Sequence, residues 1–559
     1  MSSQLDLRTA ARVGSLAGVV TLSVSVVGML ESFDQRDLIV GMLTLGQLLL
    51  FSAPFIAGYL ATRDENEIES GSAIMRGAIA GVLTAVPLII LILLTLAAPN
   101  IRNSLVNISP EMIGLLSLGA SNKIVGSILL FVVMAVLGVA GAAVHIFPNS
   151  IGKPLAAGLG WMLGLAILSE VSLNILRPIL GRSIMRAFFG SKGITPLLAA
   201  IIFVVAIGLN LWWNKNGRQR YETRKAALSE AQQKQSRRLT LIAGIVLLLT
   251  LPLILGTYLT EVVDNVGLFI LMGLGLNIVV GYAGLLDLGY VAFFAIGAYV
   301  MGILTSQGAL GIGHLSFWLA LPIAVGTAVL FGVTLGMPVL RMRGDYLAIV
   351  TLGFGEIIRV LATSDLLKPY IGGAQGVLQI GKPTIFGFEM VKPIHFYYLI
   401  LAGVALAAFV SSRLRDARLG RQWMALREDE DVAEAMGIHL VSTKLLAFGI
   451  GAAFSGLAGA IFSARLSSIF PHSFNLLISI NVLSLIIVGG IGSLPGVVVG
   501  ALVLVGLPEL LREFAEYRML LYGVLLIAMM IARPEGLWPS PIIRREFHAD
   551  EEEVLGGVQ

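Results

Sequence analysis

Long apolar segments alternate with short polar ones along the whole chain. Six apolar segments precede the first long polar stretch, and ten follow it. They span approximately residues 13–30, 38–60, 74–98, 124–146, 155–179 and 195–213, and then 239–259, 264–281, 286–305, 317–339, 346–363, 396–412, 444–465, 476–492, 496–511 and 517–532. A helix needs about 20 apolar residues to cross the hydrocarbon core of a bilayer. The pattern therefore predicts an all-α, polytopic membrane protein with about 16 transmembrane helices.

Composition favours a membrane protein over a large soluble one. Of the 559 residues, 57% are hydrophobic and only 13% are charged, and the mean hydropathy is +0.89. Soluble domains carry about 25% charged residues. The chain has no cysteine, which excludes disulfides, thiolate metal sites and cysteine nucleophiles. Arg8 and Arg12 precede the first apolar segment, but this segment is long and lacks a small-residue cleavage site, so we expect a retained helix rather than a signal peptide.

Residues 214–238 form the first long polar stretch, with eight Lys or Arg and two Glu. The positive-inside rule places this linker in the cytoplasm, together with the arginine-rich loop 413–443 and the tail after the last apolar segment. Both termini are therefore predicted to be cytoplasmic. The chain is predicted to divide into an N-terminal transmembrane region (1–213), the basic linker (214–238), a second transmembrane region (239–540) and a cytoplasmic tail (541–559).

One loop disagrees with this topology. Residues 180–194 are predicted to lie outside, yet they include Arg182, Arg186 and Lys192. Either this loop is a re-entrant or interfacial segment, or the number of helices predicted for the N-terminal half is wrong.

In two places along the chain, a glycine-rich break separates two apolar segments. One break runs from Gly281 to Gly289 and the other from Gly489 to Gly496. Broken helices at corresponding positions in two halves of a transporter indicate its substrate path, although glycine-rich turns between membrane helices are also common. On the first interpretation, we predict that the translocation path or gate includes Asn277, Gly281, Tyr282, Asp287, Gly490 and Gly492.

Glu356 and Arg359 are charged residues inside an apolar segment, spaced so that they share one helical face. A charge at the bilayer centre costs at least about 2.5–3.5 kcal/mol, so such residues face the protein interior or water. Two interpretations stay open, an ion pair within the packed helices or a part of the translocation path or its outer gate. Asp287 also has an alternative interpretation, because it is placed to cap a broken helix.

No catalytic motif is present. Lys153 and Lys382 each follow glycine but precede proline, so there is no Walker A phosphate loop. None of the six histidines is followed by glutamate, which excludes the zinc-protease helix motif. We therefore predict no catalytic residue, no metal site and no cofactor on this chain. Nucleic-acid binding is not expected either, because the basic residues lie between apolar segments.

The segment Gly420–Ile438, GRQWMALREDEDVAEAMGI, resembles the coupling segment of ABC importer permeases. Within that class it is similar to the M-type permeases of branched-chain amino-acid importers. Further segments similar to the same subfamily are Leu276–Tyr290, Gly344–Arg359, Gly372–Gly376, Gly489–Gly496 and Arg533–Trp538. The resemblance covers about 240–540, in the expected order. Residues 1–238 lie outside it, so the N-terminal region is expected to be accessory.

The resemblance implies a permease subunit of an ATP-driven importer in the cytoplasmic (inner) membrane of a prokaryote. The implied partners are a second permease, two cytoplasmic ATPases that hold ATP and magnesium, an external substrate-binding protein and the lipid bilayer. The expected cargo is a branched-chain or related small amino acid. Alternatives are a permease for urea or short amides, an ion-coupled secondary transporter that uses Glu356 or Asp287, and a structural membrane protein.

The coupling segment is predicted to contain a short helix at 429–436. Its first turn is acidic, and the helix dipole favours anions there. Gly437 is predicted to end the helix, as glycines commonly do. By resemblance, the ATPase-coupling loop comprises Arg427, Glu428, Asp429, Glu430, Glu434, Ala435, Gly437 and Ile438. The alternative is a loop that is merely solvated.

Overall fold

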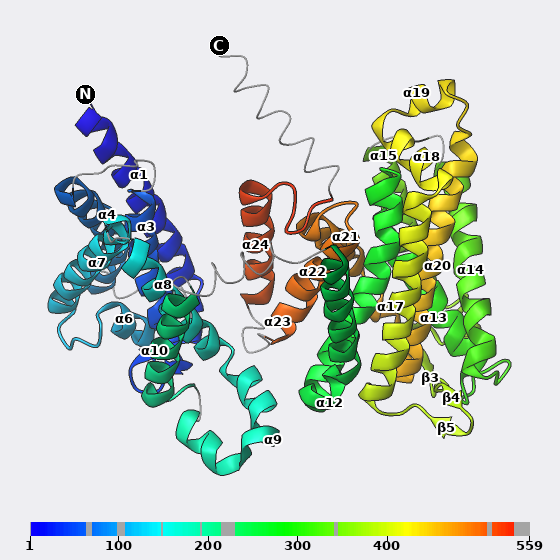
Figure 1. The fold of residues 1–559 in the computed structure, drawn as a ribbon, viewed down its shortest axis with the longest axis horizontal. Coiled ribbons are helices and arrows are strands. Elements are labelled where there is room, and N and C mark those ends of the chain that lie inside the picture. Colours follow the sequence, from blue (N-terminus) through cyan, green and yellow to red (C-terminus); the bar gives the residue numbers. More distant parts are fainter. Residues whose placement is uncertain are drawn as a thin grey trace. The chain divides into compact units, whose positions relative to one another are not determined.

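The computed structural model describes residues 2–62, 70–97, 107–146, 149–190, 193–213, 230–339, 342, 345–510 and 517–540. The chain forms two compact units, Met1–Ala243 and Gly244–Gln559. Helices dominate both units (Figure 1). Most of the predicted basic linker, at 214–229, and the whole predicted tail, at 541–559, lie outside the described residues.

The N-terminal unit is built of helices and one short hairpin. The helices are α1 (Ser2–Val26), α2 (Met29–Asp34), α3 (Leu45–Leu60), α4 (Ser70–Ala97), α6 (Pro110–Leu116), α7 (Lys123–Ile146), α8 (Asn149–Ile167), α9 (Ser169–Phe188) and α10 (Pro196–Trp212). Strands β1 (Asp37–Ile39) and β2 (Leu43–Thr44) form the antiparallel hairpin before α3.

Two predicted boundaries in this unit are wrong. The predicted apolar segment 38–60 begins as the β1–β2 hairpin, because Thr44 caps α3 and forms a capping box with Gln47. The predicted segment 155–179 spans the end of α8 and the start of α9, and α9 has a kink at Gly181. Much of the predicted 180–194 loop is therefore helical.

Glycines bring α3, α4 and α7 into close contact. A Cβ built on Gly138 of α7 would lie 2.9 Å from the Cα and the backbone nitrogen of Gly81 on α4, and its other near neighbour is the backbone of Gly77. Gly58 of α3 also packs against the backbone of Gly138. Small residues let helix backbones approach in lipid, where van der Waals packing rather than a hydrophobic force holds helices together.

The second unit contains most of the remaining helices. They are α12 (Glu230–Leu276), the π-helix η2 (Asn277–Tyr282), α13 (Val291–Thr305), α14 (Phe317–Val339), α15 (Asp345–Thr363), α16 (Lys368–Ile371), η3 (Gly373–Gln375), α17 (Pro393–Asp416), α18 (Arg418–Glu428), α19 (Glu430–Ala435), α20 (Leu440–Leu466), η4 (Pro471–Ser473), α21 (Leu476–Gly489), α22 (Leu494–Ala501), the π-helix η5 (Leu502–Gly506), α23 (Leu507–Leu510) and α24 (Arg518–Ala532). The first of them, α12, begins in the N-terminal unit.

Short strands join the helices at one end of this unit. Strand β3 (Val377–Leu378) pairs with β6 (Ser468–Ile469), and β4 (Thr384–Ile385) pairs with β5 (Phe388–Glu389). Helix α19 lies at the opposite end (Figure 1).

The break predicted between the apolar segments 239–259 and 264–281 is misplaced, because Glu261 and Asp264 are not in a turn. These residues lie inside α12, and the chain changes direction at Gly256 instead, where φ is 72°. Pro252 removes the backbone donor that would bond the Leu248 carbonyl four residues earlier. The hydroxyl of Tyr397 donates to that carbonyl at 2.7 Å, so the interruption is satisfied by α17.

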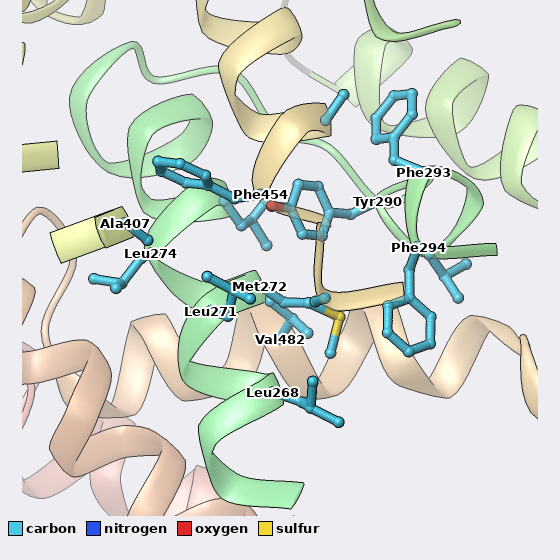
Figure 2. Close-up of a cluster of buried hydrophobic side chains, with 14 of the residues drawn as sticks. Leu268, Leu271, Met272, Leu274, Tyr290, Phe293, Phe294, Ala407, Phe454 and Val482 are labelled. Atoms are coloured by element: carbon cyan, nitrogen blue, oxygen red, sulfur yellow. The ribbon is translucent and has the colours of Figure 1, made fainter. Parts of the chain in front are cut away.

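The core of the second unit forms where α12, α13, α17, α20 and α21 meet. Figure 2 shows Leu268, Leu271, Met272 and Leu274 of α12 beside Tyr290, Phe293, Phe294, Phe454 and Val482. Gly456 and Gly459 of α20 pack directly against the backbone of α13. Most residues of the glycine-rich break that precedes α13 are buried beside this core.

The predicted class, an all-α polytopic membrane protein, is confirmed. Nine helices among the described residues are long and apolar enough to cross a membrane, and one of them is the 45-residue stretch Arg238–Tyr282. Shorter apolar helices are Leu45–Leu60, Pro154–Ile167, Pro196–Trp212, Val291–Thr305 and Leu494–Glu509. The predicted number of 16 transmembrane helices is not confirmed.

The glycine packing in the N-terminal unit yields a first prediction. Gly138→Ala should lower the melting temperature of the purified protein, because the added methyl meets backbone atoms that cannot rotate away, and overpacking costs about 1–3 kcal/mol. Gly160→Ala is the matched control, since a Cβ on this α8 glycine has no neighbour within 4 Å. The melting temperatures of both variants are compared in the same detergent by monitoring circular dichroism during heating. Equal melting temperatures would contradict the close approach of α7 to α4.

Candidate functional site

The predicted short helix of the coupling segment is present as α19. The Asp429 carboxylate caps its N-terminus, with Oδ1 accepting from the backbone N–H groups of Asp431 at 2.8 Å and Val432 at 2.9 Å. At the other end, Gly437 has a φ of 83° and its N–H donates to the Glu434 carbonyl at 2.9 Å. The next N–H, of Ile438, donates to the Ala433 carbonyl at 3.1 Å. These two bonds form a Schellman motif, so both ends of this short helix are fixed.

The coupling segment is bonded to the first turn of α20. The Lys444 ammonium lies 2.7 Å from the Glu430 carboxylate, and the lysine side chain is only 4% exposed. The indole N–H of Trp423, a fully buried residue of α18, donates to the Thr443 carbonyl at 2.8 Å. Removing one partner of a buried ion pair leaves an uncompensated charge, so this contact holds α19 firmly to α20.

The outer surface of α19 is exposed and partly apolar. Val432 and Met436 are exposed large hydrophobic residues, and Glu434, Ala435 and Gly437 are exposed beside them. Exposed apolar side chains rimmed by polar ones are typical of protein interaction sites.

Helix α18 lies directly against the first glycine-rich break. Here α12 passes into the π-helix η2, whose six residues are all buried. The Arg427 guanidinium donates from Nη1 to the Gly281 carbonyl at 2.9 Å. A Cβ on Gly284, which has a φ of 71°, would lie 2.9 Å from Cγ of Arg427. The break and the coupling segment are therefore in contact, although the two glycines and the arginine are more than 140 residues apart in the chain.

The two glycine-rich breaks also contact each other. The Asn277 side chain accepts at Oδ1 from the backbone N–H of Gly492 at 2.8 Å. Behind the second break, the N–H of Trp538 donates to the Gly489 carbonyl at 2.8 Å, and a Cβ on Gly490 would lie 2.7 Å from the Trp538 carbonyl oxygen. The structure thus brings together the predicted residues of both breaks.

Asp287 and Tyr282 are both buried in the first break. The Asp287 carboxylate accepts from the N–H of Gly289 at 2.9 Å and so closes a local turn. It does not cap α13, whose N-cap is Tyr290. The adjacent N–H, of Leu288, donates to the Thr351 hydroxyl at 3.0 Å, which joins the break to α15.

Glu356 and Arg359 form an ion pair on α15, with Nε of the arginine 2.9 Å from Oε1 of the glutamate. Their side chains are 46% and 38% exposed, respectively. The ion pair between these two residues therefore forms, and the described helices of its own unit leave it partly exposed. Tyr346, Ile349 and Val360 of the same helix are exposed as well.

Sequence reasoning missed Lys444, Trp423 and Thr351 as parts of this site. The position of Lys444 at the start of an apolar segment was a signal that it forms an ion pair, because a buried ammonium group requires a partner. Trp423 lies within the recognised coupling segment. Nothing in the local pattern distinguishes Thr351 from other polar residues in membrane helices.

Comparison with known proteins identifies the family. The family model for the branched-chain amino acid transport system permease component matches residues 258–531. Over 325 residues the chain is 42% identical to the high-affinity branched-chain amino acid transport system permease protein LivM of Escherichia coli (strain K12), covering 54% of this chain and 75% of that protein. No solved structure matches the chain.

More distant relatives include both LivM and LivH permease proteins. The probable branched-chain amino acid transport permease protein LivM of Methanocaldococcus jannaschii is 25% identical over 339 residues, which are 52% of this chain and 96% of that protein. The high-affinity permease protein LivH of Escherichia coli (strain K12) is 24% identical over 300 residues, which are 50% of this chain and 93% of that protein. The resemblance inferred from the motifs is confirmed, and the chain belongs to the family of branched-chain amino acid transport system permease components.

Proposed function

We propose that this chain is the membrane-spanning subunit of an ATP-driven importer for branched-chain or related small amino acids. It works with a second permease, two cytoplasmic ATPases that bind ATP and magnesium, and an external binding protein. The relatives LivM and LivH, both branched-chain amino acid permease proteins, support this cargo and the presence of a second permease. The observation that carries the proposal is the bonding of the coupling segment to the broken helices, through Arg427 and Gly281.

In this proposal the ATPase docks on the exposed surface of α19. Val432 and Met436 supply apolar contact area there, and Glu434 supplies a charge. Helix α19 acts as a rigid lever because both its ends are capped and Lys444 binds it to α20. The side of the membrane that bears α19 is accordingly the cytoplasmic side, and the chain itself holds no cofactor.

Movement of the coupling segment reaches the membrane interior through two hydrogen bonds. Arg427 links α18 to the Gly281 carbonyl, and Asn277 links the same π-helix to Gly492 in the second break. Carbonyl and amide groups at helix breaks are the backbone sites that line transport paths. Nucleotide-driven movement of α19 therefore changes the position of both breaks together.

The translocation path runs along the exposed face of α15. Glu356 and Arg359 cannot face lipid without a large desolvation cost, so this face turns toward water or toward the second permease. Residues 1–213 precede the family match, and we assign them an accessory role.

ATP dependence is the direct test of this function. The chain, reconstituted into liposomes with its second permease, its ATPases and its binding protein, should import leucine only when ATP is supplied on the ATPase side. A proton or sodium gradient without ATP should give no uptake. Gradient-driven leucine uptake would contradict the proposal, and ATP-driven uptake of urea without leucine uptake would reassign the cargo.

Arg427→Ala should uncouple ATP hydrolysis from transport. Loss of a charge-assisted hydrogen bond of about 1.5–3 kcal/mol corresponds to roughly tenfold or more, so uptake per ATP hydrolysed should fall about tenfold while ATPase association persists. Arg421→Ala is the matched control on the same helix, because the Arg421 guanidinium donates to the nearby Asp416 carbonyl rather than to the break. Uptake and phosphate release are measured on the same vesicles. A normal ratio in Arg427→Ala would show that this bond does not transmit movement.

Gly437→Val should weaken association with the ATPases. Among the described residues, none beyond its chain neighbours lies within 4 Å of a Cβ at Gly437, so the effect comes from the left-handed backbone conformation, which disfavours a Cβ by about 1–2 kcal/mol. Gly437→Asn is the control, since asparagine tolerates this conformation. Co-purification of the ATPases with each variant provides the measurement. Equal recovery with valine and asparagine would mean that the shape of the α19 terminus is unimportant for docking.

A further inference from the structure

The β4–β5 hairpin presents apolar side chains that the described part of the chain leaves exposed. Ile385, Phe386 and Phe388 are exposed large hydrophobic residues, and Phe386 at the tip has 106% of its reference exposed area. Phe388 packs only partly, edge-on, against the ring of His395. The hairpin is well formed, because Ile385 pairs with Phe388 and the N–H of Met390 donates to the Pro383 carbonyl at 2.9 Å.

The tip residue is unusual for this kind of turn. The two-residue loop consists of Phe386 and Gly387, with φ values of 49° and 82°. Positive φ at both positions is typical of type I′ hairpins, which prefer asparagine, aspartate or glycine there. A phenylalanine is disfavoured in this conformation and gains no burial within the chain. Local folding therefore gives no reason for the aromatic side chain, which points to a contact outside the chain.

The hairpin is attached at the edge of an exposed apolar surface of α14. The indole N–H of Trp318, in the first turn of α14, donates to the Thr384 carbonyl of β4 at 2.8 Å. The exposed face of α14 continues from there through Leu319, Ile323 and Leu330. These residues belong to the candidate membrane span Phe317–Pro338. Strand β4 is thus bonded to the end of a candidate membrane-spanning helix that has an exposed apolar face.

Other side chains around the hairpin match the composition of a membrane interface. Tryptophan and tyrosine gather at the level of the lipid headgroups, and lysines there extend their ammonium groups toward the phosphates. Trp318 and the partly exposed Tyr398 lie near the first turns of α14 and α17. Lys382 and Lys392 flank the hairpin in sequence, and β5 also carries the exposed Glu389.

We propose that the β4–β5 hairpin is a membrane anchor whose Ile385, Phe386 and Phe388 insert into the headgroup region of the bilayer beside α14. Because Trp318 bonds β4 to α14, the apolar side chains of the hairpin and the exposed apolar face of α14 form one continuous surface, and we place this surface against lipid. Insertion holds the outer ends of α14 and α17 at a fixed depth. An external binding protein is the competing occupant of this surface, and the experiment distinguishes the two.

Site-directed spin labelling tests the anchor, because the chain has no cysteine. Phe386→Cys is labelled in the full-length chain, reconstituted into vesicles of phosphatidylethanolamine and phosphatidylglycerol. Ala374→Cys is the control, since Ala374 is an exposed residue of η3 on the same connection. We expect the label at 386 to be several-fold more accessible to oxygen than to a water-soluble nickel chelate, and the label at 374 to show the opposite preference.

Two results would overturn the proposal. One is a label at 386 that is as accessible to the nickel chelate as the label at 374, which would place the tip in water. The other is protection of the 386 label only after the external binding protein is added, which would assign the surface to that protein. If Phe386→Cys fails to insert into vesicles, Ile385→Cys on β4 carries the same label and the same two criteria.

Discussion

A membrane interior supplies no water to satisfy backbone N–H and C=O groups, and this constraint determines how the broken helices are built. Three interruptions of the helices are compensated by distant parts of the chain. The Gly281 carbonyl receives a hydrogen bond from Arg427, and the Gly492 amide donates to Asn277. The Leu248 carbonyl, freed by Pro252, receives the hydroxyl of Tyr397. The breaks exist only because other helices pack closely enough to complete them.

This compensation joins elements that would otherwise move independently. If a side chain that bonds a buried carbonyl moves away, the carbonyl is left without a hydrogen-bond partner, which costs about 1–3 kcal/mol. Arg427 is therefore held to the π-helix, and α18 with it. Because Glu430 and Lys444 fix the next helix to α20, the whole coupling segment is bonded to the membrane core at separate points. The physical requirement that stabilises the break also makes it responsive to the coupling segment.

Local features of the fold were predictable from sequence, and long-range ones were not. Most apolar segments become helices, and the short helix after Asp429 ends at Gly437 as its cap residues predict. Those features depend on residues within one turn of each other. The bond between Arg427 and Gly281 joins residues 146 positions apart, and no periodicity encodes it. The hairpin before α3 was missed for a related reason, because its residues are apolar enough to extend the helical pattern until Thr44 caps the helix.

The positions of turns and charges show the same limit. The apolar segments 239–259 and 264–281 predicted a break between them, but the chain bends earlier, at Gly256, where a positive φ is possible without strain. For Glu356 and Arg359, spacing correctly predicted that the side chains meet, because spacing fixes the face of a helix. It could not show whether that face is covered. Exposure depends on which helices pack around α15, and that is a property of the whole unit.

The exposed ion pair and the coupling segment are connected within the same subunit. Arg427 bonds the first break at Gly281, and the break continues to Leu288, whose N–H donates to the Thr351 hydroxyl of α15. Glu356 and Arg359 lie one and two turns further along that helix. Each link in this series is either a hydrogen bond or a continuous helix. Both are stiff over such short distances, so a displacement at one end also moves the other end. In the proposed function, a shift of α19 reaches the charged face of α15 through this break, so the glycine-rich break connects the proposed ATPase-docking surface to the proposed translocation path.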